Sequence, residues 1–294
     1  MQLNTDAFET AMRELIRATA CELPQDVEQA LRRAHGAEIP GSNAELTLAL
    51  FLQNIEMAKV QKAPLCQDTG TPIVHIHHPV GVSPRRLTAM IQAVLVKATE
   101  QQYLRPNAVD PVTGHNSGNN LGNGFPQIFF TEEDAPHLDI GLMLKGGGCE
   151  NVGRQYSLPH AELHAGRDLE GVRRVVLDAV RQAEGKGCPP GVLGVCIGGD
   201  RGSGYLESKT QLFRRLDDVN PIPVLAALES RILAEANQLG IGPLGLGGKS
   251  TLLGVKIGTQ HRLPASFFVT ISYMCWEHRR RWLRIEPDGT YTII

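Results

Sequence analysis

The stretch LQNIEMAKVQKAPLCQDTGTPIVHIHH, residues 52–78, marks the point where the chain changes from helix to strand. Before Pro64, apolar residues recur at helical intervals, and the proline ring stops the helix because it cannot donate a backbone hydrogen bond. After the corner PLCQDTG, the alternating segment PIVHIHH is typical of a strand. The sequence therefore predicts a helical region over about 1–63 and a second region over about 64–285, of strands, loops and further helices, that carries the candidate site residues.

The segments on either side of this stretch extend the pattern. Ser42 and Glu45 form a capping box that opens the helix before Pro64, because each side chain can satisfy a free backbone N–H group. The expected helices lie near 5–20, 25–37, 42–63, 86–102, 170–184, 205–216 and 221–239. The expected strands lie near 72–78, 127–133, 138–148, within 187–204, at 250–258 and at 265–275, followed by a hairpin over 282–294. We expect a mixed α/β (α+β) fold in one domain, 1–294, with the helical N-terminal part packed on mixed sheets.

Composition restricts the possible classes of protein. The 294 residues include 29 Lys and Arg against 31 Asp and Glu, a formal charge of −2, so no strong field attracts nucleic acid or an anionic membrane surface. No apolar run reaches the roughly 18 residues expected of a membrane helix, and the N-terminal residues lack the apolar core of a signal peptide. We expect a cytoplasmic protein with six reduced cysteines and a small-molecule substrate.

Several glycine-rich and charged motifs admit ordinary interpretations. GLGGKST, 245–251, does not match a phosphate-binding loop, because Pro243 occupies the position of its first glycine. IGGDRGSG, 197–204, either binds an anion at a helix start or forms a plain turn. KGGGCEN, 145–151, is either a turn or a place where the backbone approaches a carboxylate. His75, His77 and His78 are expected to pack or face solvent, and the basic run EHRRRWLR, 277–284, to be a solvated strand edge.

Three cysteines lie at corners of the chain that are rich in structure breakers: Cys66 in PLCQDTG, Cys188 in GCPPG and Cys275 in YMCWEHRR. Soft thiolates select zinc or iron–sulfur clusters, and the absence of a C-x-x-C pair disfavours a zinc ribbon. Three ligands would leave one iron of a cluster open to substrate as a Lewis acid. A structural zinc module, with three thiolates and a histidine, and a thiol enzyme with Cys66 as nucleophile remain open.

Five motifs in order resemble the iron–sulfur class I fumarases and L-tartrate dehydratases, in their α subunit or N-terminal domain. They are PLCQDTGTP, LKGGGCEN, CPPGVLGVCIGG, LGIGPLGLGGKSTLLGVKI and SYMCWEHRR, and the resemblance covers roughly residues 40–285. It implies a [4Fe-4S] cluster held by Cys66, Cys188 and Cys275, whose fourth iron binds substrate. It also implies that Gln67, Arg105, Gly147 and Gly148 contact substrate carboxylates and that Asp68 is the acid–base residue.

The chain departs from the family pattern at a few positions. Leu263 stands where relatives often carry a histidine, and whether His261 replaces it is open. Cys149 is not counted as a ligand, and Cys21 and Cys196 are expected to be core thiols. The resemblance further implies a β subunit that completes the site, so the chain is expected to act as half of an oligomeric enzyme.

The substrate expected from the motifs is a small dicarboxylate. Hydration of fumarate to malate is the first choice, and L-tartrate and mesaconate remain alternatives. These substrates differ by one hydroxyl or methyl group, which motif spacing does not distinguish.

Overall fold

The computed structural model describes residues 4–294, which divide into two compact units. Unit 1 consists of the chain up to Pro24, of Asn54–Gly147 and of Arg279–Ile294. Unit 2 consists of Gln25–Gln53 and Gly148–His278. The boundary at Gln53 falls within one helix, so this helix belongs partly to each unit.

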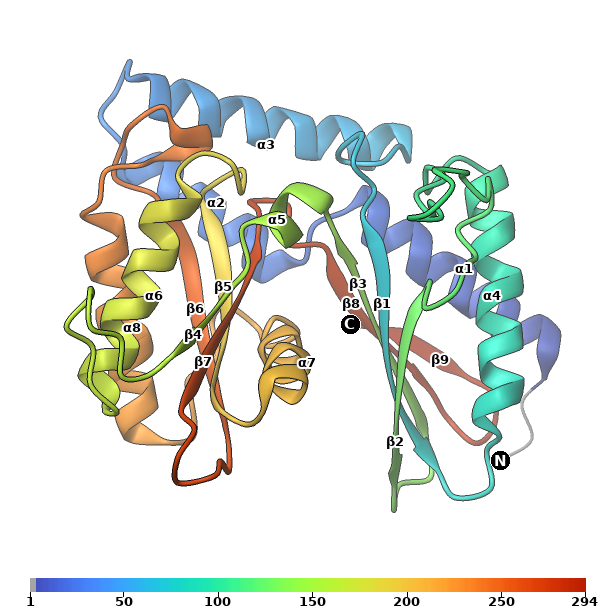
Figure 1. Ribbon diagram of the computed structural model, residues 1–294. Helices are drawn as coiled ribbons and strands as arrows, with labels where there is room; N and C mark the ends of the chain where they lie inside the picture. The colour runs from blue at the N-terminus through green and yellow to red at the C-terminus, as the bar shows by residue number, and fades with distance from the viewer. Residues whose placement is uncertain (1–3) are drawn as a thin grey trace. The chain divides into compact units, whose positions relative to one another are not determined.

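Unit 1 contains a mixed sheet of five strands in the order β2-β1-β3-β8-β9 (Figure 1). β1 is parallel to β2, and the other neighbours are antiparallel. The strands are β1 (Thr71–Pro79), β2 (Gln127–Glu133), β3 (Leu138–Lys145), β8 (Arg280–Ile285) and β9 (Tyr291–Ile293). Helices α1 (Thr5–Cys21) and α4 (Pro84–Glu100) pack on each other, and α1 also packs on β3 and β8.

The core of unit 1 forms where the apolar faces of its helices, which repeat about every 3.6 residues, meet the apolar face of its sheet, which repeats every two residues. Met12 and Leu15 on α1 and Leu87 and Ile91 on α4 belong to the same buried apolar cluster as Val74 and Ile76 of β1. Residues two apart on a strand share one face, so β1 presents this pair to the helices. The expectation of N-terminal helical structure packed on a mixed sheet is confirmed.

Unit 2 contains a second mixed sheet, of four strands in the order β4-β7-β5-β6. The strands are β4 (Arg154–Ser157), β5 (Gly191–Gly198), β6 (Leu252–Gln260) and β7 (Phe268–Met274). The helices of this part are α2 (Gln25–Ala37), α3 (Asn43–Gln61, shared with unit 1), α5 (Gly147–Asn151), α6 (Leu169–Ala183), α7 (Arg201–Gln211) and α8 (Pro223–Asn237), with a short 3-10 turn at Pro243–Gly245.

Strand β5 is buried along its whole length because helices cover both of its faces. Leu193 and Val195 join the apolar cluster that includes residues of α6 and α8. On the other face, a Cβ at Gly194 would lie 2.0 Å from the carbonyl oxygen of Ser208 on α7. The glycine therefore permits α7 to pack directly on the strand.

The element boundaries differ from expectation in three places. β4 and α5 were not expected, since the first has only four residues and the second begins within the KGGG segment. Helix α7 begins at Arg201, about four residues early, because the side chain of Asp200 caps it by accepting from the backbone N–H of Gly202 and Ser203.

Two expectations about burial are also corrected. The basic run 277–284 is not a solvated edge: β8 lies between β3 and β9, and Arg279 and Arg280 are 1% and 5% exposed. On α3, Phe51 is buried, whereas Leu46 and Leu50 on another side of the helix are 54% and 63% exposed. Apolar periodicity identified this helix correctly but not which of its apolar residues are buried. No helix among the described residues has the length and apolar character needed to cross a membrane.

Candidate active site

The corner after α3 carries the first group of expected site residues, all in unit 1. Cys66 is half-buried, and the backbone N–H of Asp68 points to its sulfur at 3.4 Å. Gln67 lies exposed at the turn. The corner therefore carries a thiol, an amide and a carboxylate on three consecutive residues.

The carboxylate of Asp68 is held by backbone donors from two sides. The N–H of Gly70 donates to Oδ1 at 3.0 Å, and the N–H of Gly147 donates to Oδ2 at 2.8 Å. Arg279 donates from Nη2 to the Asp68 carbonyl oxygen at 2.7 Å. Two backbone donors fix the orientation of the carboxylate, while each oxygen keeps a second lone pair for another proton or donor.

Gly70 allows the corner to approach strand β3. Its φ is +78°, and a Cβ there would lie 2.8 Å from backbone atoms of Lys145. A side chain at this position would push the corner away from the strand end that leads to Gly147. The sequence QDTG thus supplies both the acid and the residue that lets it reach its second donor.

Arg105 lies beside the same corner. Its backbone N–H donates to Thr69 Oγ1 at 2.9 Å, and its exposed guanidinium donates from Nη1 to the Gln67 carbonyl oxygen at 3.4 Å. Asn120 donates to the Arg105 carbonyl oxygen at 2.8 Å and accepts from the backbone of Asn107 at 2.8 Å. The asparagine-rich loop therefore positions Arg105. Unit 1 thus brings Gln67, Asp68, Arg105 and Gly147 close together, and their roles at a site stay predictions.

Unit 2 carries the other two expected metal ligands. Cys188 is exposed, and its φ of +53° is in the left-handed region that a residue with a Cβ seldom adopts. The backbone N–H of Trp276 donates to the Cys188 carbonyl oxygen at 3.2 Å, which ties the Cys188 turn to the residue after Cys275. The ring of Trp276 stacks on Phe51 with 4.0 Å separating the ring centroids. Left-handed backbone conformations such as that of Cys188 cluster at functional sites.

Tyr273, which motif analysis did not select, lies among the thiols of unit 2. A Cβ on Gly187 or Gly191 would lie 2.6 Å or 2.3 Å from its ring, so both glycines are needed for its fit. Burial raises the pKa of the Tyr273 hydroxyl, and the nearby Cys149, Cys275 and Cys188 raise it further when they carry charge. In the sequence, the glycines on either side of Cys188 could have indicated that a large side chain packs against this segment.

The remaining cysteines have different surroundings. Cys149 is buried at the start of α5, with its sulfur 3.9 Å from the Gly187 carbonyl oxygen. Gly148 precedes it, and a Cβ there would meet the carbonyl oxygen of Lys186 at 3.4 Å. Cys21 and Cys196 are fully buried, and burial raises their pKa values to about 11 and about 12. The last two are core thiols, as expected.

The donor chemistry suits a thiolate-bound iron–sulfur cluster. Cys66, Cys188 and Cys275 are all free of disulfides and lie at turns or strand ends, not within helices. Cys66 belongs to unit 1 and the other two to unit 2. Within residues 4–294, no group of three or more His, Cys, Asp or Glu side chains forms a metal site. The three-cysteine ligand set therefore stays a prediction.

Two glycine-rich motifs bind carboxylates of the chain itself. In the GLGGKST segment, the backbone N–H groups of Lys249 and Ser250 donate to Glu38 at distances of 2.8–3.0 Å. At the start of α7, Asp200 occupies the backbone donors, and these hydrogen bonds lower the pKa of its carboxylate. Both segments serve the fold, which supports the ordinary interpretation of each.

A family model described as fumarate hydratase (Fumerase) matches residues 9–284. The chain belongs to the fumarate hydratase family. It is 48% identical over 282 residues to a Geobacillus stearothermophilus protein named as a class I fumarate hydratase; the match covers 95% of this chain and 55% of that relative, so the chain spans about half of its length.

Other members of the fumarate hydratase family are matched over most of their length. A Methanocaldococcus jannaschii protein named as an L(+)-tartrate dehydratase subunit alpha is 35% identical over 281 residues, 94% of this chain and 96% of the relative. The L(+)-tartrate dehydratase subunit alpha of Escherichia coli is 32% identical over 274 residues, 92% of this chain and 88% of the relative. Proteins with two different substrates in their names are thus similar to this chain.

Proposed function

We propose that the chain is the cluster-binding part of a cytoplasmic hydro-lyase that interconverts fumarate and malate. The observation that carries this proposal is the environment of Asp68. Its carboxylate is oriented by the N–H groups of Gly70 and Gly147 and lies in a corner with Cys66 and Arg105. An acid–base group, a metal-ligand candidate and a cation for a carboxylate can together catalyse the addition of water to a dicarboxylate.

In this proposal, Cys66, Cys188 and Cys275 hold a [4Fe-4S] cluster. When bound, the cluster supplies a Lewis-acidic iron that assists the departure or addition of hydroxide. The exposed Cys188 and the half-buried Cys66 lie in turns, where the thiolates are accessible to a cofactor. Because the three proposed cysteine ligands come from both units, we propose that residues 1–294 act as one functional domain.

Asp68 performs the proton transfer. In the dehydration direction, one of its carboxylate oxygens takes the proton from the carbon next to a substrate carboxylate, and in the hydration direction it returns this proton. The backbone donors at Oδ1 and Oδ2 hold the group in place throughout. Positioned proton transfer of this kind contributes about 10²–10⁴-fold to a rate.

Substrate carboxylates are bound by Arg105, by the side chain of Gln67 and by the backbone N–H of Gly148, next to Gly147, whose own N–H is occupied by Asp68. Arg105 and Gln67 are exposed, and a guanidinium can pair with a carboxylate through two parallel hydrogen bonds. The absence of side chains at the two glycines gives the backbone of α5 close access to a ligand. Each carboxylate of the substrate would thereby have a donor of its own.

Fumarate is preferred over tartrate because the relative named as a fumarate hydratase has the higher identity, 48% against 35% and 32%. The tartrate alternative is supported by the relatives that this chain matches over 88–96% of their length, which carry tartrate dehydratase alpha-subunit names. Those names also support a β-subunit partner for this chain. Comparison of fumarate, L-tartrate and mesaconate as substrates distinguishes the possibilities.

Anaerobic reconstitution with iron and sulfide tests the proposed cofactor. We expect about four irons and four labile sulfides per chain, with visible absorption from thiolate-bound iron. The Cys188→Ser variant should lose this absorption and its iron, whereas Cys196→Ser, at a buried core thiol, is the matched control and should keep both. Retention of iron by Cys188→Ser would refute the ligand assignment.

The same experiment separates the alternative functions. Stoichiometric zinc in place of iron and sulfide would support a structural zinc module. Alkylation of Cys66 that abolishes activity in a metal-free protein would support a thiol enzyme. Either result would exclude the hydro-lyase mechanism proposed above.

A further inference from the structure

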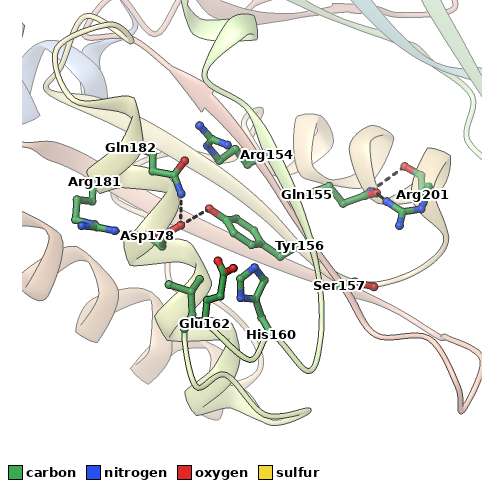
Figure 2. Close-up of a pocket in the computed structure, with 11 residues that line it drawn as sticks. Arg154, Gln155, Tyr156, Ser157, His160, Glu162, Asp178, Arg181, Gln182 and Arg201 are labelled. Carbon is green, nitrogen blue, oxygen red and sulfur yellow. Dashed lines mark hydrogen bonds and ion pairs between the residues drawn. The ribbon is translucent and has the colours of Figure 1, made fainter.

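We infer that unit 2 contains a second ligand site, separate from the Asp68 corner, that binds a small phosphate anion. The site is a cavity of about 620 Å³ formed by β4, α6, the loop after β4 and the first residue of α7. Its volume is within the range of small-molecule sites in proteins. Figure 2 shows the polar side chains that line it.

The cavity lining has a surplus of one positive charge. Three arginines, Arg154, Arg181 and Arg201, line it together with two carboxylates, Asp178 and Glu162, and Arg201 lies beside Gln155, apart from the group around Asp178 (Figure 2). Arginine is the residue best suited to phosphate, because its planar guanidinium donates two parallel hydrogen bonds to neighbouring oxygens. The surplus of positive charge favours an anion over a neutral or cationic ligand.

The buried carboxylate of the cavity is already neutralised by the protein. Asp178 accepts from the hydroxyl of Tyr156 at 2.8 Å, from Arg181 at 3.0 Å and from the amide of Gln182. Burial disfavours its charge, but these donors outweigh burial and lower the pKa of the carboxylate. Asp178 and Arg181 therefore cancel, and Glu162 is the lining carboxylate that Arg154 and Arg201 still outweigh.

Arg154 and Arg201 are the cations available to a ligand. Arg154 pairs with Ile271 of β7 through its backbone, and its side chain is exposed at the cavity. Arg201 is held by the side-chain oxygen of Gln155 at 3.1 Å, and its guanidinium lies 4.7 Å from the ring centroid of Phe268. The guanidinium of Arg154 can therefore adjust to a ligand, whereas that of Arg201 is already held in position.

Further donors favour a phosphate over a carboxylate. Ser157 and His160 also line the cavity and can donate from a hydroxyl group and an imidazole N–H. In the view of Figure 2, His160 lies on one side of the Tyr156 ring and Arg154 on the other. A phosphate presents three oxygens and can accept from such separated donors, whereas a carboxylate presents two in one plane.

Isothermal titration of the full chain with pyrophosphate at constant ionic strength tests this inference. We expect saturable binding that weakens about tenfold to hundredfold in Arg154→Gln and in Arg201→Gln, since each variant loses charge-assisted hydrogen bonds. Arg33→Gln, at an exposed arginine of α2 outside the cavity, is the matched control and should bind as the parent does. Circular dichroism verifies that each variant is folded.

Four outcomes would overturn the inference. They are the absence of pyrophosphate binding to the folded parent chain, equal binding by all three variants, binding of citrate as tight as that of pyrophosphate, and loss of binding in Arg105→Gln with retention in Arg154→Gln. The last result would assign the anion to the Asp68 corner. Because the readout is binding and not turnover, the inference can fail while the proposed hydro-lyase activity stands.

Discussion

The carboxylate of Asp68 accepts a hydrogen bond on each oxygen, so the substitution Asp68→Asn tests its proposed role in proton transfer directly. In Asp68→Asn, the amide keeps one acceptor oxygen, but its NH₂ group faces a backbone N–H of Gly70 or Gly147 and cannot accept from it. We expect turnover to fall by about 10²–10⁴-fold with the iron content unchanged. Steady-state kinetics and iron analysis on the same preparation measure both quantities.

Asp110→Asn is the matched control for this substitution. Asp110 is also in unit 1 and also accepts from backbone N–H groups, those of Val112 and Thr113, but in an exposed loop turn. Turnover should remain near the parent value there. An Asp68→Asn variant that keeps both its iron and its rate would remove Asp68 from the mechanism.

Individual residues of the site were predictable because a turn is a local feature of sequence. The segment PLCQDTG contains the structure-breaking residues, the acid and the glycine of the corner, and in the structure Gln67 and Asp68 lie beside Arg105. The contribution of Arg279 was not predictable in the same way. Its hydrogen bond to the Asp68 carbonyl oxygen joins residues that are 211 positions apart, and only the pairing of strands brings them together.

At the scale of elements, β1 carries a histidine whose burial should make stability depend on pH. His75 is 7% exposed, and burial, with a smaller contribution from His77, lowers its pKa from 6.5 to about 4. Between these two values the unfolded chain binds more protons than the folded one, so stability falls as pH decreases from about 6.5 to about 4. The loss attributable to His75 is about 3 kcal/mol when the shift of the pKa is converted at 1.36 kcal/mol per unit.

Urea unfolding at pH 7, 5 and 4 measures this dependence. His75→Phe removes the titrating group and should flatten the pH dependence by about one proton, whereas His115→Phe, in an exposed loop, should leave it unchanged. Identical slopes in the parent and in His75→Phe would show that the buried imidazole does not titrate as its surroundings indicate.

The types of most elements could be read from sequence, but the burial of their faces could not. Apolar periodicity located α3, and it assigned the same significance to buried Phe51 and to exposed Leu50. Likewise, the basic composition of 277–284 predicted a solvated strand, yet β8 is placed between two other strands. Strand order depends on contacts between distant segments, and these are not encoded in the local pattern.

The whole molecule has two separate buried cores, one in each unit, and the proposed ligands come from both units. The family match covers 9–284, yet motif order alone does not supply the mutual placement of thiols that lie in different units. The proposed assembly of a cluster on the intact chain is consequently a hypothesis about the whole molecule. The proposed requirement for a partner is a hypothesis of the same scale.

We expect the reconstituted chain alone to hold its cluster and to dehydrate malate at less than about a hundredth of the rate reached after a β-type chain is added, because remote groups that position a substrate contribute this much or more to a rate. The measurement is fumarate formation, followed by its ultraviolet absorption, during titration with the partner. Activity should rise to a plateau at a fixed ratio of the two chains. The Asp68→Asn chain mixed with the same partner serves as the control, since it should bind the partner without restoring activity. Full turnover by the unmixed chain would refute the partner requirement and leave the cluster and Asp68 assignments to be judged by their own experiments.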